Sequence, residues 1–343
     1  MFGFKLNQSK PAKFFRFALF SAFFAYGVVL LGAYTRLSDA GLGCPDWPGC
    51  YGRLFAPTTA QDLNEARSFH PEKPVESDKA WKEMVHRYVA GALGLLILRL
   101  AALGFQLRRA NRRQQYKLPL VVTVLVFFQA ILGMLTVTLQ LKPLIVMAHL
   151  MGGMTILAAL WWIALREQRF WKPVSETPKS GRLRIFAFLG LIVVSIQIAL
   201  GGWTSANYAA LVCPDFPTCQ GVWWPNVDFV DAFTLWRGIG INYEGGVLTL
   251  AAATAVHMAH RIGAAVTFLY IGWLALYTMR VGGDTKLCRY GMLVLAMLLA
   301  QVVLGIMNVV LHLPLAIAVA HNAVGGLLLL SLVTLNHVVR PRR

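Results

Sequence analysis

Two short clusters of ionisable residues stand at the start of long apolar stretches of the sequence. They read Glu83-Met84-Val85-His86-Arg87 and His257-Met258-Ala259-His260-Arg261. On a helix, residues three apart share one face, about one turn from each other. Ionisable groups at membrane depth are costly and are usually functional. Histidines suit metal or haem ligation, and the single glutamate suits proton transfer or charge stabilisation.

The composition predicts a polytopic membrane protein. The chain has 343 residues, of which 57% are hydrophobic and 14% charged, and its mean hydropathy is +0.59. These values exclude a soluble globular domain and a disordered chain. The net charge of +17 does not indicate a nucleic-acid partner, because the basic residues cluster in short loops between apolar runs.

Eight apolar runs have about the length needed to cross a bilayer. We predict spans near residues 14–35, 84–107, 118–139, 144–165, 185–206, 247–279, 290–311 and 315–338. The sixth run is too long for one simple span, so we expect its first turns to project or the helix to tilt.

The distribution of charge predicts the orientation of these spans. With the N-terminus inside, 21 of the 32 basic residues fall on the inner side and 12 of the 15 acidic residues on the outer side. Both termini are therefore expected in the cytoplasm, with long outer loops at 37–82 and 207–246. There is neither a cleavable signal pattern nor an Arg/Ser-rich leader, which favours a bacterial inner-membrane protein.

The chain is also an internal duplication. Residues 32–50 align without gaps to 201–219 at an offset of 169, and Gln129–Gly133 aligns to Gln301–Gly305 at an offset of 172. Four spans per repeat is an even number, so both halves share one orientation. We predict an all-α fold of two tandem four-helix bundles, residues 1–180 and 181–343, related by a pseudo-two-fold axis along the membrane normal.

Four of the eight histidines occupy repeat-related places on the even-numbered spans: His86, His149, His260 and His321. Each lies on the order of 10 Å below the outer surface. Two histidines at one depth in a bundle can supply both axial ligands of a haem. The alternative is that each forms a hydrogen bond between helices. The glycines after His149 and His321 either leave room for a macrocycle or serve helix packing.

The other histidines have weaker claims to a site. His257 shares a face with His260 but matches Glu83, and its role stays open. His312 is expected at the rim, while His70 and His337 are expected to have no site role.

Three arginines are candidate partners of haem propionates: Arg36, Arg87 and Arg261. Two of them follow a candidate ligand directly, and Arg36 ends the first span. The alternative is anchoring at the membrane interface, which suits Arg36 better than Arg87.

The outer loops contain two Cys-x5-Cys pairs, Cys44/Cys50 and Cys213/Cys219. An oxidising compartment permits a disulfide in each pair, and a four-cysteine zinc site is the alternative. We expect the second pair to be structural, whereas thiol exchange stays open for the first. Cys288 is expected to be a free thiol on the inner side.

Together these motifs resemble the haem A synthase family. The resemblance rests on Thr35-Arg36-Leu37-x5-Gly43-Cys44-Pro45-Asp46-Trp47-Pro48, Glu83-x-x-His86-Arg87, His149, His260-Arg261 and His321-Asn322-x-x-Gly325. It covers nearly the whole chain, and the paired outer cysteines resemble a bacterial subclass.

The resemblance implies an enzyme that oxidises the C8 methyl of haem O to the formyl group of haem A by successive hydroxylations. It implies a haem b between His260 and His321, the substrate haem near His86 and His149, and a reactive role for Glu83. Haem O synthase and terminal oxidase assembly proteins are the implied partners, besides membrane lipids.

Other readings of the same residues stay open. Glu83 could shuttle protons, or its charge could stabilise a substrate carbocation before water attacks. A di-haem b-type electron-transfer cytochrome would explain the four histidines but gives Glu83 no task. A transporter or a non-catalytic assembly factor is the third reading.

Overall fold

The fold is helical, as predicted. The computed structural model describes residues 10–69, 71, 74–110, 115–167, 178–281 and 285–340. Within those ranges the only β features are two isolated bridges, Cys50 to Arg53 and Cys219 to Val222. His70 and part of the basic residues behind the orientation prediction lie outside the described residues, namely Lys5, Arg112, Arg113, Arg169, Lys172, Arg342 and Arg343.

Eight helices in the described ranges are long and apolar enough to cross a membrane, which confirms the predicted number. They are α1 (Lys10–Leu37), α3 (Ser77–Ala110), α4 (Lys117–Thr138), α5 (Pro143–Glu167), α6 (Pro178–Ala206), α8 (Leu250–Val281), α9 (Thr285–Val310) and α10 (Leu315–Val338). Shorter pieces lie between them: α2 (Ala60–Phe69), a 3-10 turn η1 (Ala209–Leu211) and α7 (Phe229–Ala232).

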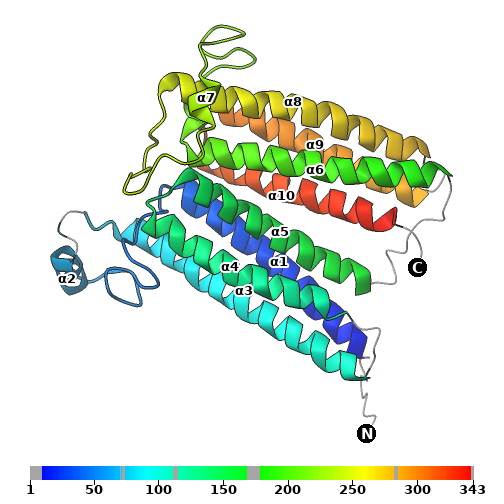
Figure 1. The fold of residues 1–343 in the computed structure, drawn as a ribbon, viewed down its shortest axis with the longest axis horizontal. Helices are drawn as coiled ribbons and strands as arrows, with labels where there is room; N and C mark the ends of the chain where they lie inside the picture. Colours follow the sequence, from blue (N-terminus) through cyan, green and yellow to red (C-terminus); the bar gives the residue numbers. More distant parts are fainter. Residues whose placement is uncertain are drawn as a thin grey trace.

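The helix contacts repeat between the two halves of the chain. In the first half α1 packs on α3 and α5, and α4 packs on α3 and α5. In the second half α6 packs on α8 and α10, and α9 packs on α8 and α10. Contacts of α5 with α6 and α10, and of α1 with α10, join the halves (Figure 1). This pattern is compatible with two four-helix bundles.

Small residues let the helices approach closely. On α1, the small residues Ala18, Ala22 and Ala25 continue a buried stripe at helical spacing that begins with Phe14. Hydrogen bonds then join the halves: the Tyr26 hydroxyl donates to the carbonyl of Ala323 at 3.0 Å. Because α1 and α10 are neighbours in this contact, the two halves form one continuous helical body.

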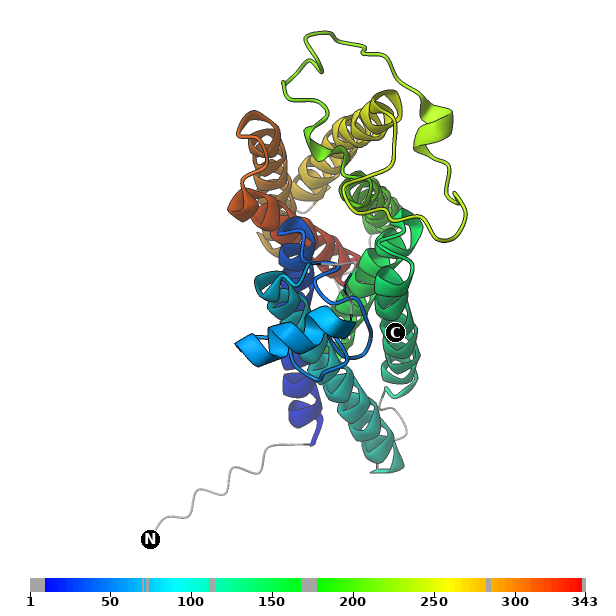
Figure 2. The same cartoon turned by 90° about the vertical axis from the view of Figure 1, so that its left-hand side faces the viewer.

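The long connections gather at one end of the helices, which we call the loop side. The 38–76 connection carries α2, and the 207–249 connection carries η1 and α7 (Figures 1 and 2). The start of α1 and the end of α10 lie at the opposite end (Figure 1). The turns of Gln140 and His312 are also equivalent, since both residues have positive φ, at 48° and 57°. His312 therefore lies at the rim, as predicted.

Both cysteine pairs form disulfides, Cys44 to Cys50 and Cys213 to Cys219. Their sulfurs are thereby used, so the zinc alternative is wrong. No group of three or more His, Cys, Asp or Glu side chains in the described part of the chain could hold a metal ion. Cys288 is a free thiol, as predicted.

Each disulfide loop is closed by an aspartate that accepts two backbone N–H groups. Asp46 accepts from Tyr51 at 2.6 Å and Gly52 at 2.9 Å. Asp215 accepts in the same way from the N–H groups at 220 and 221, at 2.6 and 3.0 Å. Hydrogen bonds from Thr218 and from these backbone groups lower the pKa of Asp215. The duplication therefore extends to the detailed geometry of the loops.

Candidate haem-binding site

The four repeat-related histidines lie on α3, α5, α8 and α10, and each residue as a whole is half-buried. They fall into two pairs. His86 and His149 lie on α3 and α5 of the first half, and His260 and His321 lie on α8 and α10 of the second half. Each half therefore contains one of the histidine pairs that the family resemblance implies, and the sharing of one haem by each pair stays a prediction.

Each of these imidazoles lies against a glycine of the preceding membrane-spanning helix. For His86 and His260 these helices are α1 and α6. A Cβ added at Gly32 or Gly201 would lie 2.9 Å from Cε1 of His86 or 3.1 Å from Cε1 of His260.

The other two histidines repeat this arrangement. A Cβ added at Gly133 would lie 3.3 Å from Cε1 of His149, and one at Gly305 would lie 3.2 Å from Cε1 of His321. The only signal of this role in the sequence is that the glycines recur in the repeat, where Gly32 matches Gly201 and Gly133 matches Gly305.

The glycines after His149 and His321 lie against glutamine side chains of neighbouring helices, and room for a macrocycle beside them stays a prediction. A Cβ at Gly152 would lie 2.2 Å from the side-chain oxygen of Gln129, and one at Gly325 would lie 3.3 Å from the amide nitrogen of Gln301. The space directly next to these two glycines is therefore occupied by glutamine side chains.

Glutamine amides contact three of the four histidines. Gln129 donates to the carbonyl of His149, and the Gln301 amide lies 3.2 Å from Nε2 of His321. Gln197 lies 3.1 Å from Nδ1 of His260 and also donates to its carbonyl. The repeat counterpart of Gln197 is Val28, so this contact belongs to the C-terminal half alone.

The residues present fit haem groups held by the two histidine pairs. Imidazole is a usual axial ligand of haem iron. In the described part of the chain, the buried Nδ1 atoms of His86, His149 and His321 have no hydrogen-bond partner. The buried Nε atoms of Arg36 and Arg261 also lack one, which leaves a donor for an anionic carboxylate such as a haem propionate.

Gly201→Val is expected to weaken haem retention by the C-terminal half about tenfold, because the added side chain displaces the His260 ring. The haem-to-protein ratio of the purified protein measures this. Gly272→Val is the matched control, since the atom nearest to a Cβ there is Leu298 Cδ2 at 3.8 Å. Equal haem content in the two variants would contradict the prediction.

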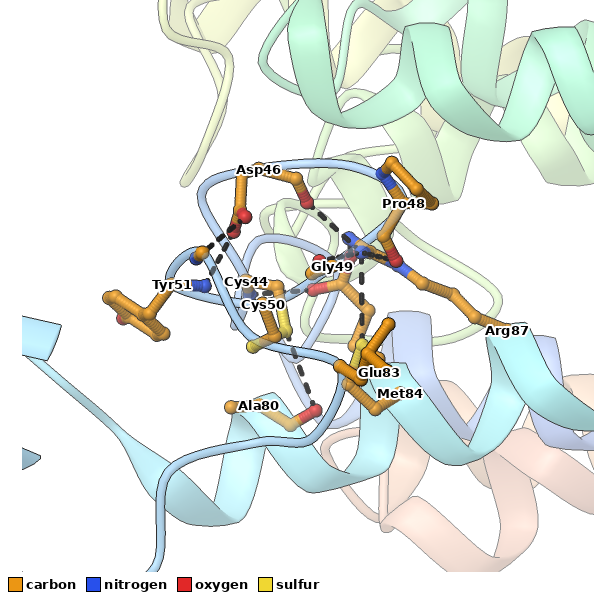
Figure 3. Close-up of a disulfide and its surroundings, with 12 residues drawn as sticks. Cys44, Asp46, Pro48, Gly49, Cys50, Tyr51, Ala80, Glu83, Met84 and Arg87 are labelled. Atoms are coloured by element: carbon orange, nitrogen blue, oxygen red, sulfur yellow. Dashed lines mark hydrogen bonds and ion pairs between the residues drawn. A yellow bond between two sulfur atoms is a disulfide. The ribbon is translucent and has the colours of Figure 1, made fainter. Parts of the chain in front are cut away.

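Glu83 is 4% exposed and lies beneath the first disulfide loop. Its carboxylate accepts the backbone N–H of Cys44 at 2.9 Å and forms an ion pair with Arg87 (Figure 3). A backbone N–H group and a guanidinium therefore both serve as hydrogen-bond donors to this buried carboxylate. The polar residues at the start of α3 place Glu83 in the second turn of the helix, before the apolar run begins.

Arg87 and Arg261 both hold the disulfide loops. Arg87 donates to the carbonyls of Asp46 at 3.0 Å and Gly49 at 2.6 Å (Figure 3). Arg261 donates to the carbonyls of Asp215 at 2.6 Å and Thr218 at 2.7 Å. This shared task was not expected from the sequence, and the propionate assignment stays a prediction beside it.

Arg36 joins the two halves of the chain. It donates to the carbonyl of Ser205 at 2.5 Å, and its guanidinium lies 4.1 Å from the ring centroid of Tyr208. An ion pair with Asp39 at 3.6 Å completes its contacts.

His257 also contacts the loop side of the protein. Its Nδ1 lies 2.9 Å from the carbonyl of Ala209, so Nδ1 carries the proton in this bond. Glu83 and His257 therefore both contact backbone of the loop-side connections, but only Glu83 brings a negative charge.

Comparisons with known proteins agree with these features. The COX15-CtaA family, described as cytochrome oxidase assembly protein, matches residues 15–333. A protein named Heme A synthase from Shewanella oneidensis is 47% identical over 310 residues, which cover 90% of this chain and 92% of the relative. Proteins of the same name from Chelativorans sp. and Bacillus pumilus are 25% and 26% identical, over 89% and 86% of this chain and 84% and 85% of theirs. The chain therefore belongs to the COX15-CtaA family.

Proposed function

We propose that this protein is a haem A synthase that oxidises the C8 methyl of haem O to a formyl group. The observation that carries the proposal is the asymmetry of an otherwise repeated site. The four candidate ligand histidines, the glycines opposite them, the Arg87/Arg261 pair and the disulfides recur in the two halves, whereas the carboxylate of Glu83 is matched by His257. The names of the relatives support the same activity.

In the C-terminal half, His260 and His321 would hold a haem b, whose chemistry when bound is electron transfer. The glycines opposite them keep space at both rings. Arg261 would offer its Nε to a propionate while its terminal nitrogens hold the second loop. Gln197 would fix the orientation of the His260 ring.

In the N-terminal half, His86 and His149 would hold the substrate haem O. Glu83 is one turn before His86 on the same face of α3, about 4.5 Å along the helix axis. Its negative charge would stabilise positive charge that develops at the substrate methyl carbon. Two successive hydroxylations, each of which removes two electrons and needs an external oxidant such as O2, would give a gem-diol, which loses water to form the aldehyde.

The charge bias of the loops supports a bacterial inner-membrane location with both termini in the cytoplasm. The loop side would then face outward, where an oxidising compartment maintains both disulfides. Haem O synthase as the source of substrate and terminal oxidase assembly proteins as recipients are the partners that this activity needs.

Pigment extraction and mass analysis after co-expression with a haem O source test the proposal. We expect haem A in cells that contain the protein and haem O alone in cells that lack it. Haem O alone in both, together with two bound haem b groups, would instead support the electron-transfer cytochrome. Purified protein without haem absorbance would favour a transporter or a non-catalytic assembly factor.

A further inference from the structure

Each disulfide loop is followed by two large apolar side chains that point away from the protein. Leu54 and Phe55 follow the first loop and are 75% and 61% exposed. Trp223 and Trp224 follow the second and are 74% and 61% exposed. The offset between the two pairs is 169 residues, the same as between the disulfides. The exposed apolar pair is therefore a feature of the repeat.

The loops hold these pairs in fixed positions. An isolated bridge joins Cys50 to Arg53 and another joins Cys219 to Val222, so each apolar pair begins directly after a bridged residue. The first disulfide packs against Met84 of α3. The second packs in the same way against Met258 of α8.

The first pair lies beside the flank of α3. The hydroxyl of Tyr88 donates to the carbonyl of Leu54, and the rings of Phe55 and Tyr88 are 6.0 Å apart. Tyr88 is 43% exposed and lies about 16 Å along α3 from its start. The exposed face of α3 continues with Leu95 and Leu98. The pair is therefore continuous with the apolar side of a membrane-spanning helix.

The second pair has an equivalent setting beside α8. The Gln220 side chain donates to Thr254, in the second turn of α8, at 3.0 Å. The ring of Trp224 lies 6.4 Å from that of Phe229. In both ribbon views the connection after α6 projects sideways past the edge of the helices near α8 (Figures 1 and 2).

We propose that these two pairs, the loop anchors Leu54/Phe55 and Trp223/Trp224, insert into the outer leaflet of the bilayer. Lipid surrounds both halves of a duplicated membrane protein alike, so it explains why both loops carry the feature. Aromatic side chains are enriched at this depth. No basic residue occurs from Asn207 to Trp236, so burial of apolar surface holds the second anchor rather than attraction to anionic headgroups.

The loop anchors would fix the depth and tilt of the disulfide loops relative to the membrane. Glu83 accepts a hydrogen bond from the backbone of Cys44. The first anchor would therefore also hold in place the disulfide loop that covers this carboxylate. The lipid contact itself is independent of the proposed haem chemistry.

Nitroxide labels test the proposal in the full-length protein. Phe55→Cys and Trp224→Cys would be labelled in a Cys288→Ser background, with both disulfides intact by thiol count. Thr58→Cys and Asn242→Cys are matched controls, because both residues are exposed on the same two connections. The protein is reconstituted in vesicles of phosphatidylethanolamine and phosphatidylglycerol. Collision rates with oxygen, which enters lipid, and with a water-soluble nickel complex are then measured by electron paramagnetic resonance.

We expect the oxygen-to-nickel ratio at positions 55 and 224 to exceed that of the controls several-fold. A ratio equal to that of the controls would place the anchors in water and overturn the proposal. Low accessibility to both reagents would mean that protein covers them, from a partner or a second copy, and would also overturn it. Haem content serves only to confirm that each variant is folded.

Discussion

Glu83→Gln is expected to yield a folded protein that retains its haem b and accumulates haem O, with haem A formation lowered about a hundredfold or more. Glutamine has nearly the shape of glutamate and can still accept the N–H of Cys44. It carries no charge, so the ion pair with Arg87 and the stabilisation of positive charge at the substrate are both lost. Extracted haems, separated and identified by mass, give the ratio of haem A to haem O.

Two further variants separate chemistry from loop anchoring. Arg87→Lys retains a positive charge beside Glu83 but lacks the planar guanidinium that contacts several loop carbonyls. If the carboxylate acts on the substrate, this variant keeps more activity than Glu83→Gln. Glu65→Gln, an exposed carboxylate on α2, is the control for the loss of a charge on the loop side. Wild-type amounts of haem A from Glu83→Gln would remove Glu83 from the mechanism.

The eight spans could be predicted from the sequence because a segment that crosses the membrane must be apolar over about 20 residues. The prediction misplaced the start of α3 by seven residues, at 84 rather than Ser77. The first two turns of this helix contain Asp78, Lys79 and Lys82, which no hydropathy window includes in an apolar run. Polar helix ends that project from a membrane are therefore the part of each span that composition cannot locate.

The four candidate ligand histidines could be singled out in the sequence because the duplication supplies a second copy for comparison. Contacts that cross between the halves have no such signal. The amino group of Lys142, on the turn before α5, donates to the carbonyl of Gly238 at 2.6 Å. Beside it, the N–H of Tyr243 donates to the carbonyl of Gln140 at 3.1 Å. The connection between α7 and α8 thus contacts the first half through its own backbone groups, the carbonyl of Gly238 and the N–H of Tyr243. The pairing of such groups depends on the fold and not on residue type.

The roles of the arginines show the same limit. A cation after a haem ligand is a reasonable partner for a propionate, and the sequence offers no reason to prefer a carbonyl. In each folded loop the aspartate accepts backbone N–H groups, while the arginine donates to backbone carbonyls of the same loop. This geometry needs the folded loop and not only its sequence.

His260→Ala and His321→Ala are each expected to abolish the tightly held haem b and its absorbance. His86→Ala and His149→Ala are expected to keep it, because those residues lie on α3 and α5 in the other half of the chain. His312→Asn is the matched control: it removes a histidine at the turn before α10, and asparagine tolerates the positive φ of 57° found there. Visible spectra of the purified, reduced proteins distinguish these outcomes.

Thermal unfolding gives a second measure of the same prediction. A ligand present at about 100 times its Kd stabilises the folded state by about 2.7 kcal/mol. Loss of haem b should therefore lower the Tm of the His260→Ala and His321→Ala proteins in detergent, whereas His312→Asn should leave it unchanged. An alternative pairing, in which one haem bridges the two halves, predicts that His86→Ala or His149→Ala removes the same spectral band. A full haem b spectrum in His260→Ala would exclude His260 as an axial ligand, and with it the division of labour between the two halves.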